Sequence, residues 1–245
     1  MRWIDVGGAL AIAAMAAGAQ QSPPPVQQLP SGPAVPAIPA PAGRPVVQPP
    51  RFMVVIDAAH GGSDIGARIG EGIPEKDVTL GLAGRLRSTL HARGVEVAMT
   101  RTGDVNLAEV NRAEVANRAQ ASACLTIHAT ATGSGVHLYT SSLTAAASDR
   151  FLPWATAQAA YVTQSMKLES EIDTALAHAA IPVTLGKASV APMDSIACPE
   201  VAVELAPLVG GHVTLAKALT DVSYQKTVVD AVAAALEQWR SDWKP

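Results

Sequence analysis

From residue 52 onwards, short apolar runs alternate with longer stretches in which apolar side chains recur at helical spacing. The apolar runs predict strands at residues 53–56, 95–99, 124–127, 135–140, 183–185 and 201–205. The helical spacing predicts helices at residues 75–92, 106–119 and 224–239, and an alanine-rich region at residues 148–180 that should divide into two helices. Strands that alternate with helices predict an α/β fold, a single-domain layered sheet with helices on both faces.

The helix expected at residues 75–92 has the clearest signals. Val78, Leu82, Leu86 and Leu90 recur every four residues and would form one apolar side. Gly94 follows at the position where a glycine commonly ends a helix. The residues before it, 63–74, are polar and glycine-rich, and we expect them to form a loop.

The first 50 residues differ from the rest in composition. Residues 1–19 combine Arg2, an apolar run and an Ala-Gly-Ala sequence, which is the pattern of a cleaved signal peptide. A membrane anchor is the alternative, but the apolar run is shorter than the roughly 20 residues that a spanning helix needs. Residues 20–50 are rich in Pro, Ala and Gln and favour an extended linker. We therefore expect a folded domain at residues 51–245, a periplasmic or extracellular location, and no membrane span after cleavage.

Composition and charge narrow the classes of partner. Hydrophobic residues make up 49% of the chain, which is enough for a sizeable core. The net charge of -3 offers no basic face for nucleic acid, and 4% aromatic residues argue against a stacking surface for bases or sugars. Cys124 and Cys198 are too few for a disulfide framework. After export they could pair, and two buried thiols are an equally good interpretation.

Three ionisable side chains stand at positions that suggest chemistry. His60 and His128 follow apolar strands, so a parallel arrangement would bring them to the same edge of the sheet. Glu204 lies within an apolar strand, where an ionised carboxylate needs a metal, a partner or a shifted pKa. Each has a structural alternative, either a hydrogen-bonded loop histidine or a glutamate paired with an arginine. Together, two histidines and a glutamate are the donors from which a catalytic zinc site is built.

Four motifs, taken in order, resemble the zinc-dependent N-acetylmuramoyl-L-alanine amidases of the Amidase_3 family. They are Val54-Val55-Ile56-Asp57-x-x-His60-Gly61-Gly62, Glu75-Lys76-Asp77-Val78, Thr126-Ile127-His128-Ala129 and Val203-Glu204. Asn111-Arg112-Ala113 and Ala116-Asn117-Arg118 also resemble the second helix of that family. The similarity runs from about residue 52 to residue 236, nearly the whole expected domain.

The resemblance implies a role for each matching position. His60, Glu75 and His128 would bind Zn²⁺, and Glu204 would be the catalytic carboxylate. Without the resemblance, Glu75 would be an acid that the helix dipole favours. Three protein ligands leave a fourth position for water, as metal-assisted hydrolysis requires. The implied fold is phosphorylase/hydrolase-like, and the implied substrate is peptidoglycan, cleaved between N-acetylmuramic acid and L-alanine in cell-wall remodelling or cell separation.

The chain departs from the family pattern at three places. It has Ala58-Ala59 where Pro-Gly is usual, Thr130 where asparagine is usual, and Leu205-Ala206-Pro207-Leu208 where Gly-Phe-Leu-x-Asn is common. These departures leave open a non-catalytic or regulatory peptidoglycan-binding protein on the same fold, and a zinc peptidase is a third interpretation. Some relatives carry a helix that occludes the zinc until an activator protein removes it. Residues 148–180 are therefore a hypothetical inhibitory lid.

The remaining polar candidates have simpler interpretations. Asp57 is a candidate for orienting a ligand histidine, and Asp64 is interpreted as a turn residue. The other histidines are interpreted as residues without a role at the metal, namely His91, His137, His178 and His212.

Overall fold

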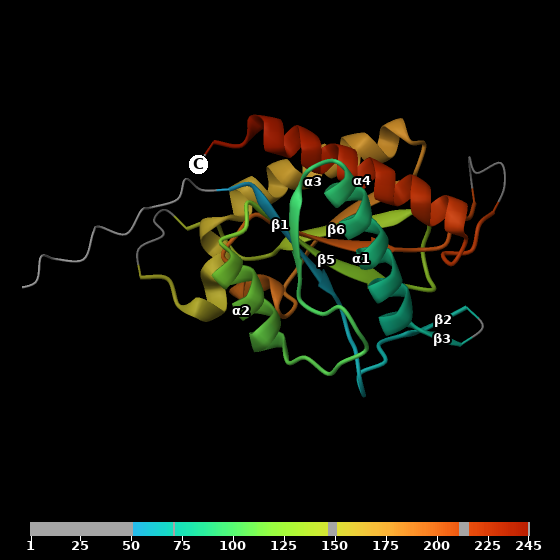
Figure 1. Cartoon of the computed structure of the whole chain (residues 1–245), viewed down its shortest axis with the longest axis horizontal. Helices are drawn as coiled ribbons and strands as arrows, with labels where there is room; N and C mark the ends of the chain where they lie inside the picture. The colour runs from blue at the N-terminus through green and yellow to red at the C-terminus, as the bar shows by residue number, and fades with distance from the viewer. Residues whose placement is uncertain (1–50, 71, 147–150, 211–215, 245) are drawn as a thin grey trace, which may run out of the picture. The chain divides into compact units, whose positions relative to one another are not determined.

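The computed structural model describes residues 51–70, 72–146, 151–210 and 216–244 (Figure 1). The signal peptide and linker expected at residues 1–50 lie outside the described residues. All described residues belong to one compact unit, 48–245. No helix within these described ranges is both long and apolar enough to cross a membrane.

A sheet in the order β4-β1-β5-β8-β6-β7 forms the centre of the described domain. Its strands are β1 (Met53–Ala58), β4 (Glu96–Met99), β5 (Ala123–Ala129), β6 (Val136–Ser141), β7 (Val183–Ala188) and β8 (Glu200–Leu205). The strands β4, β1, β5 and β8 are parallel, whereas β6 is antiparallel to β8 and carries β7 at the edge of the sheet. The carboxyl ends of β1, β5 and β8 therefore meet at one end of the sheet, where open α/β sheets place their ligand sites.

Helices cover both faces of this sheet, as the sequence predicts (Figure 1). One face is covered by α1 (Glu75–Ala92), α3 (Val162–His178) and α4 (Val222–Asp242). The other face is covered by α2 (Glu109–Ala119) and the short 3-10 helices η1 (Trp154–Ala160) and η2 (Met193–Ser195).

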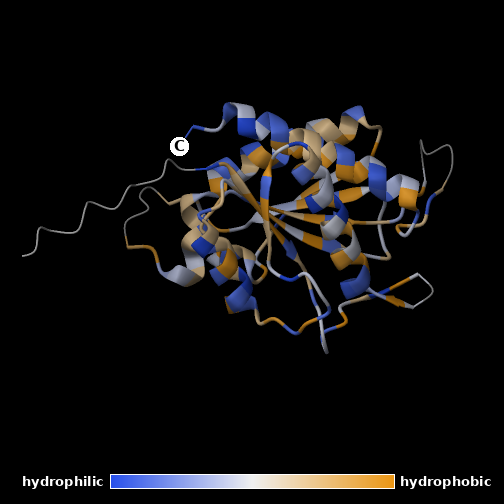
Figure 2. Cartoon of the chain, in the orientation of Figure 1, coloured by the Kyte–Doolittle hydropathy of each residue, from blue (hydrophilic) through white to orange (hydrophobic). Residues whose placement is uncertain are grey.

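The two faces of the sheet differ in chemistry because successive strand residues point to opposite sides. On β8, Val201 and Val203 belong to the large apolar core beneath α1, α3 and α4. Glu200 and Glu204 alternate with them and therefore point to the face that α2 covers, alongside His128 of β5. Figure 2 shows the strands mainly in apolar colours, whereas the helices carry both hydrophobic and hydrophilic residues. The polar groups of the site thus stand on the less apolar face.

The helix α1 spans the predicted residues, and its contacts explain why its signals are readable. Leu82, Leu86 and Leu90 are all buried in the large core. At the end of the helix, Gly94 has a φ of 71° and donates its N–H to the carbonyl of His91 at 3.0 Å. The next N–H, that of Val95, reaches the carbonyl of Leu90 at 3.0 Å. This pair of hydrogen bonds is a Schellman motif, in which glycine adopts the left-handed conformation without strain.

Two parts of the domain differ from their sequence prediction. The helix α2 begins at Glu109 rather than at residue 106, and Val110 is 53% exposed because Arg112, Ala113 and Ala116 form the buried side instead. The loop expected at residues 63–74 contains a small antiparallel hairpin, β2 (Arg68–Ile69) with β3 (Ile73–Pro74).

The lid hypothesis is wrong for α3, the principal helix of residues 148–180. Leu168, Ile172 and Leu176 of this helix are fully buried in the large core. They pack on the face of the sheet that lies opposite His128 and Glu204. A helix that supplies part of the core cannot swing away from a site on the other face of the sheet.

Candidate metal centre

Three side chains converge at the carboxyl ends of the parallel strands. His60 follows β1, Glu75 is the first residue of α1, and His128 is the next-to-last residue of β5. One ligand atom from each lies within 4.8 Å of the others, and the two imidazole rings are 5.4 Å apart in an edge-to-face arrangement. The structure therefore brings together the three residues for which the family resemblance implies metal binding.

The carboxylate of Glu75 lies between the two histidines. Its Oε2 is 3.1 Å from Nε2 of His60, and its Oε1 is 2.9 Å from Nδ1 of His128. The backbone N–H groups of Ala67 and Ala129 donate to the same two oxygens at 2.9 and 3.0 Å. Burial would raise the pKa of Glu75, but these hydrogen bonds outweigh it and hold the pKa below its ordinary value. Glu75 is thus a carboxylate that is ready to act as a ligand.

The ring of His60 is oriented by a carboxylate of its own loop. Its Nδ1 lies 2.8 Å from Oδ2 of Asp64, which leaves Nε2 to face Glu75. The hydrogen bond with Glu75 raises the pKa of His60, burial opposes this, and Asp64 adds to the increase. Carboxylates that hold the second nitrogen of a ligand histidine commonly fix its tautomer and orientation. Asp64 is therefore more than the turn residue predicted from the sequence.

The backbone around His60 is held by a buried arginine of α2. Arg112 donates from Nη2 to the carbonyl of His60 at 2.6 Å and from Nη1 to the carbonyl of Ala58 at 2.8 Å. Its charge is paired with Asp57, whose Oδ1 lies 2.8 Å from Nη1. The sequence suggested that Asp57 orients a ligand histidine. In the structure Asp57 instead holds Arg112, which anchors the backbone of His60. This support stabilises the positive φ of His60, 63°, which is uncommon outside glycine.

The donor set fits a metal ion of the zinc class. Two imidazole nitrogens and a carboxylate oxygen are the ligands that catalytic zinc sites use, with further positions left for water or substrate. Gly66 shapes the site because a Cβ at that position would lie 2.6 Å from Cδ2 of His60 and 2.7 Å from Oε2 of Glu75. The chain keeps this position free of a side chain, so the two ligands can approach each other.

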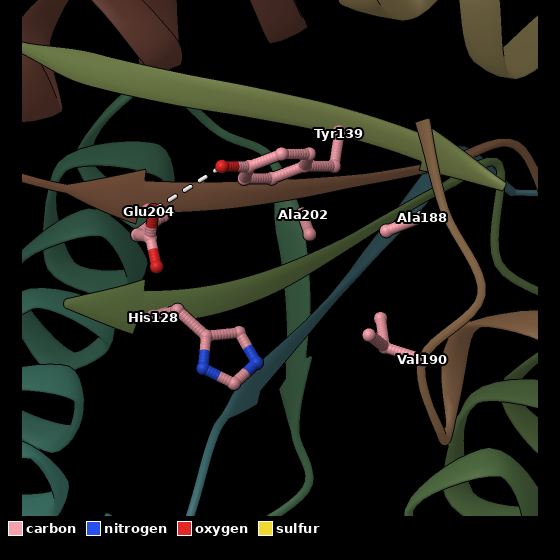
Figure 3. Close-up of a pocket in the computed structure, with 6 residues that line it drawn as sticks. All are labelled: His128, Tyr139, Ala188, Val190, Ala202 and Glu204. Carbon is pink, nitrogen blue, oxygen red and sulfur yellow. Dashed lines mark hydrogen bonds between the residues drawn. The ribbon is translucent and has the colours of Figure 1, made fainter. Parts of the chain in front are cut away.

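Glu204 lies on β8, beside the candidate metal ligand His128 of β5. Its backbone is paired with His128 on one side and with His137 on the other. The side chain is 26% exposed and borders a cavity of about 220 Å³. The residues that line this cavity are His128, Tyr139, Ala188, Val190, Ala202 and Glu204 (Figure 3). The predicted catalytic carboxylate therefore borders a cavity and lies next to His128, a candidate metal ligand.

Two further ionisable residues, one on β6 and one on β8, were not identified by sequence reasoning. His137 was interpreted as having no role at the metal, yet its Nδ1 lies 2.7 Å from Oε2 of Glu204. Glu200 is fully buried on the same side of β8, and burial raises its pKa to about 8. The alternation of β8 could have indicated Glu200, because Glu200, Ala202 and Glu204 share a face. His91 and His178 lie on exposed helix ends, and His212 lies outside the described residues.

A disulfide joins Cys124 and Cys198, so the structure favours pairing over two buried thiols. Cys124 lies on β5, the strand of His128, and Cys198 lies two residues before the start of β8, the strand of Glu204. The bond thus ties β5, which carries the candidate metal ligand His128, to the segment that leads into β8 and Glu204. A disulfide of this kind is typical of exported proteins.

The sequence matches a family model, Amidase_3, described as N-acetylmuramoyl-L-alanine amidase, over residues 54–238. It is 39% identical over 77 residues to N-acetylmuramoyl-L-alanine amidase AmiA of Escherichia coli (strain K12), which covers 31% of this chain and 27% of that protein. It is 32% identical over 108 residues to N-acetylmuramoyl-L-alanine amidase AmiC of Neisseria meningitidis serogroup B, which covers 42% of this chain and 26% of that protein. The chain thus spans about a quarter of the length of these relatives.

Solved structures share the fold. The N-acetylmuramyl-L-alanine amidase Ami1 from Mycobacterium smegmatis aligns with a TM-score of 0.62 and 20% identity, over 78% of this chain and 98% of that chain. The catalytic domain of the amidase CwlV from Bacillus (Paenibacillus) polymyxa var. colistinus aligns with a TM-score of 0.60 and 22% identity, over 78% of this chain and 98% of that chain. The sheet and its helical layers are therefore those of known amidase catalytic domains.

Proposed function

This chain belongs to the Amidase_3 family of N-acetylmuramoyl-L-alanine amidases, and from that premise we propose that residues 51–245 form a zinc-dependent hydrolase that acts on peptidoglycan. The bond cleaved is the amide between N-acetylmuramic acid and the L-alanine of the stem peptide. The observation that carries the proposal is the convergence of His60, Glu75 and His128, with Glu204 open to the adjoining cavity.

Each ligand has one atom available for the zinc ion. His60 would use Nε2, because Nδ1 is bound to Asp64, whereas His128 would use Nδ1, which faces Glu75. The buried carboxylate of Glu75 compensates the charge of the cation and holds both rings in place. Zinc in such a site supplies a Lewis acid that activates water and polarises a carbonyl group.

Glu204 would be the general base. It would accept the proton of the attacking water and then deliver that proton to the leaving amide nitrogen. The cavity beside it has apolar walls formed by Ala188, Val190 and Ala202. These walls would bind apolar parts of the substrate and limit the access of competing water.

Features outside the site bear on where in the cell the reaction would take place. The disulfide between Cys124 and Cys198 supports an exported protein, and the signal-like residues 1–19 and the linker 20–50 would place the domain in the periplasm or outside the cell. There it would serve cell-wall remodelling or cell separation. An activator protein remains part of the proposal, but it would have to act by a route other than displacement of α3.

Metal analysis of variants tests the proposed roles. Glu204→Gln should keep one zinc per chain and an unchanged thermal midpoint, because it preserves shape and removes only the basic oxygen. Its turnover should fall by ~10²–10⁴, the usual contribution of a positioned general base. His60→Ala should instead lose the zinc itself. Full activity of the Gln variant would show that Glu204 is not the base.

A further inference from the structure

We propose that His137 is a positioning residue for Glu204. The ring of His137 holds one carboxylate oxygen of Glu204, so that the second oxygen stays directed toward the metal site. This inference rests on the proposed function, because it assigns His137 to the same hydrolysis. Nδ1 of His137 lies 2.7 Å from Oε2 of Glu204. A carboxylate only accepts hydrogen bonds, so the ring nitrogen is the donor.

The register of the sheet sets this contact. Because β6 is antiparallel to β8, His137 is directly paired with Glu204, and their side chains emerge on the same face. Two residues further along β6, the hydroxyl of Tyr139 lies 3.5 Å from the same Oε2 atom. Both donors of β6 thus converge on one oxygen. Figure 3 shows the other oxygen of Glu204 pointing toward His128.

The imidazole ring of His137 is itself held in a fitted slot. Its side chain is only 13% exposed. On the side away from Glu204, Gly133 is so close that an added Cβ would lie 2.4 Å from both Cε1 and Nε2 of the ring. Gly133 has a φ of 83°, which also favours glycine. The ring therefore has little room to turn away from the carboxylate.

These contacts give His137 a task that the metal ligands do not perform. A carboxylate attached to a flexible side chain can rotate, and a general base works only when its acceptor oxygen faces the proton to be removed. With Oε2 held by the Nδ1–H, the second oxygen keeps that orientation through the reaction. The proton of His137 is not transferred; it remains on the ring while Glu204 takes up and releases the proton of water.

The test compares two substitutions that differ in one donor. His137→Leu removes the hydrogen bond at similar volume, whereas His137→Asn places an amide nitrogen near the position of Nδ1. In the zinc-loaded full chain, His137→Leu should lower kcat by ~10–100-fold, the effect of a misplaced catalytic group, with KM within about twofold of wild type. His137→Asn should recover most of the loss. His178→Leu, a histidine on an exposed helix end, is the control and should match wild type.

The outcomes separate this proposal from the one on which it rests. If the wild type releases stem peptides and His137→Leu keeps its kcat, the role of His137 is refuted and the amidase stands. If His137→Asn is as slow as His137→Leu and both melt at lower temperature, the contact is only structural and the proposal is overturned. If the zinc-loaded wild type releases no stem peptides, the proposed function fails, and the assignment of His137 to that reaction fails with it.

Discussion

Substitution of Gly66 by alanine should weaken metal binding strongly, although Gly66 is not one of the three proposed ligands. Its φ of 62° lies in the left-handed region, so an alanine there costs about 1–2 kcal/mol in backbone strain. The same cost falls on Gly70→Ala in the neighbouring hairpin, where φ is 48° and nothing lies within 4 Å of an added Cβ. Strain alone therefore predicts equal effects for the two variants.

Contact with the ligands makes the two variants differ. The added Cβ at position 66 would lie 2.6 Å from Cδ2 of His60 and 2.7 Å from Oε2 of Glu75. Ordinary van der Waals contact begins near 3.4 Å. The His60 ring must therefore move away from the added Cβ by 0.8 Å (3.4 minus 2.6), and the Glu75 carboxylate by 0.7 Å (3.4 minus 2.7). Metal–ligand distances tolerate only about ±0.2 Å. We expect zinc affinity to fall at least ~100-fold, or about 2.7 kcal/mol, more than the loss from many supporting residues.

Competition with a zinc chelator of known affinity measures this difference. The zinc affinity of Gly70→Ala should lie within about threefold of wild type, while that of Gly66→Ala should be at least ~100-fold weaker. Thermal melting in the presence of chelator checks that both metal-free variants are folded. The reasoning is refuted if Gly66→Ala binds zinc like the wild type, or if Gly70→Ala loses zinc to the same extent.

Two further predictions concern stability. Burial raises the pKa of Glu200 to about 8 from 4.5, so the folded protein keeps a proton that the unfolded chain releases, and stability should fall by about 1.4 kcal/mol per pH unit between these values. Urea unfolding of Glu200→Gln should show a correspondingly flatter pH dependence than wild type, and parallel curves would contradict the burial argument. Ile172→Ala should cost about 2–5 kcal/mol because α3 is part of the core, whereas the exposed Met166→Ala should cost little; equal small losses would revive a detachable helix.

Much of the fold was predictable because its signals are local. The four-residue spacing of Leu82, Leu86 and Leu90, together with Gly94, marks α1 from the sequence alone. The direction of β6 was not predictable in this way. Antiparallel pairing of β6 with β8 depends on contacts between residues more than 60 positions apart, such as His137 and Glu204. No periodicity within either strand records that register.

In the candidate site, too, some residues were predictable from local sequence signals and others were not. His60 and His128 are recognisable because each follows an apolar strand, but Glu75 has the appearance of any acid at a helix start and needed the family resemblance. Asp57 and Asp64 show the limit of spacing arguments. Both lie within four residues of His60, yet Asp64 holds the ring while Asp57 pairs with Arg112, and only the loop geometry decides between them.

The departures from the family pattern fall around the ligands rather than on them. Ala58-Ala59 precedes His60, where carbonyl groups accept hydrogen bonds from Arg112 and from Arg101. Arg101 reaches the carbonyl of Ala59 at 3.0 Å, so the loop is anchored by side chains that the motif does not include. The backbone before His60 is therefore held in place by side chains despite the departure at Ala58-Ala59.

Product analysis by mass spectrometry tests the central claim most directly. Purified sacculi would be incubated with the zinc-loaded protein, with the chelator-treated protein and with Glu204→Gln. We expect intact stem peptides with a free L-alanine amino terminus from the zinc-loaded wild type alone. Shortened peptides would indicate a peptidase, and the absence of soluble products from a protein that carries one zinc per chain would contradict the proposed amidase.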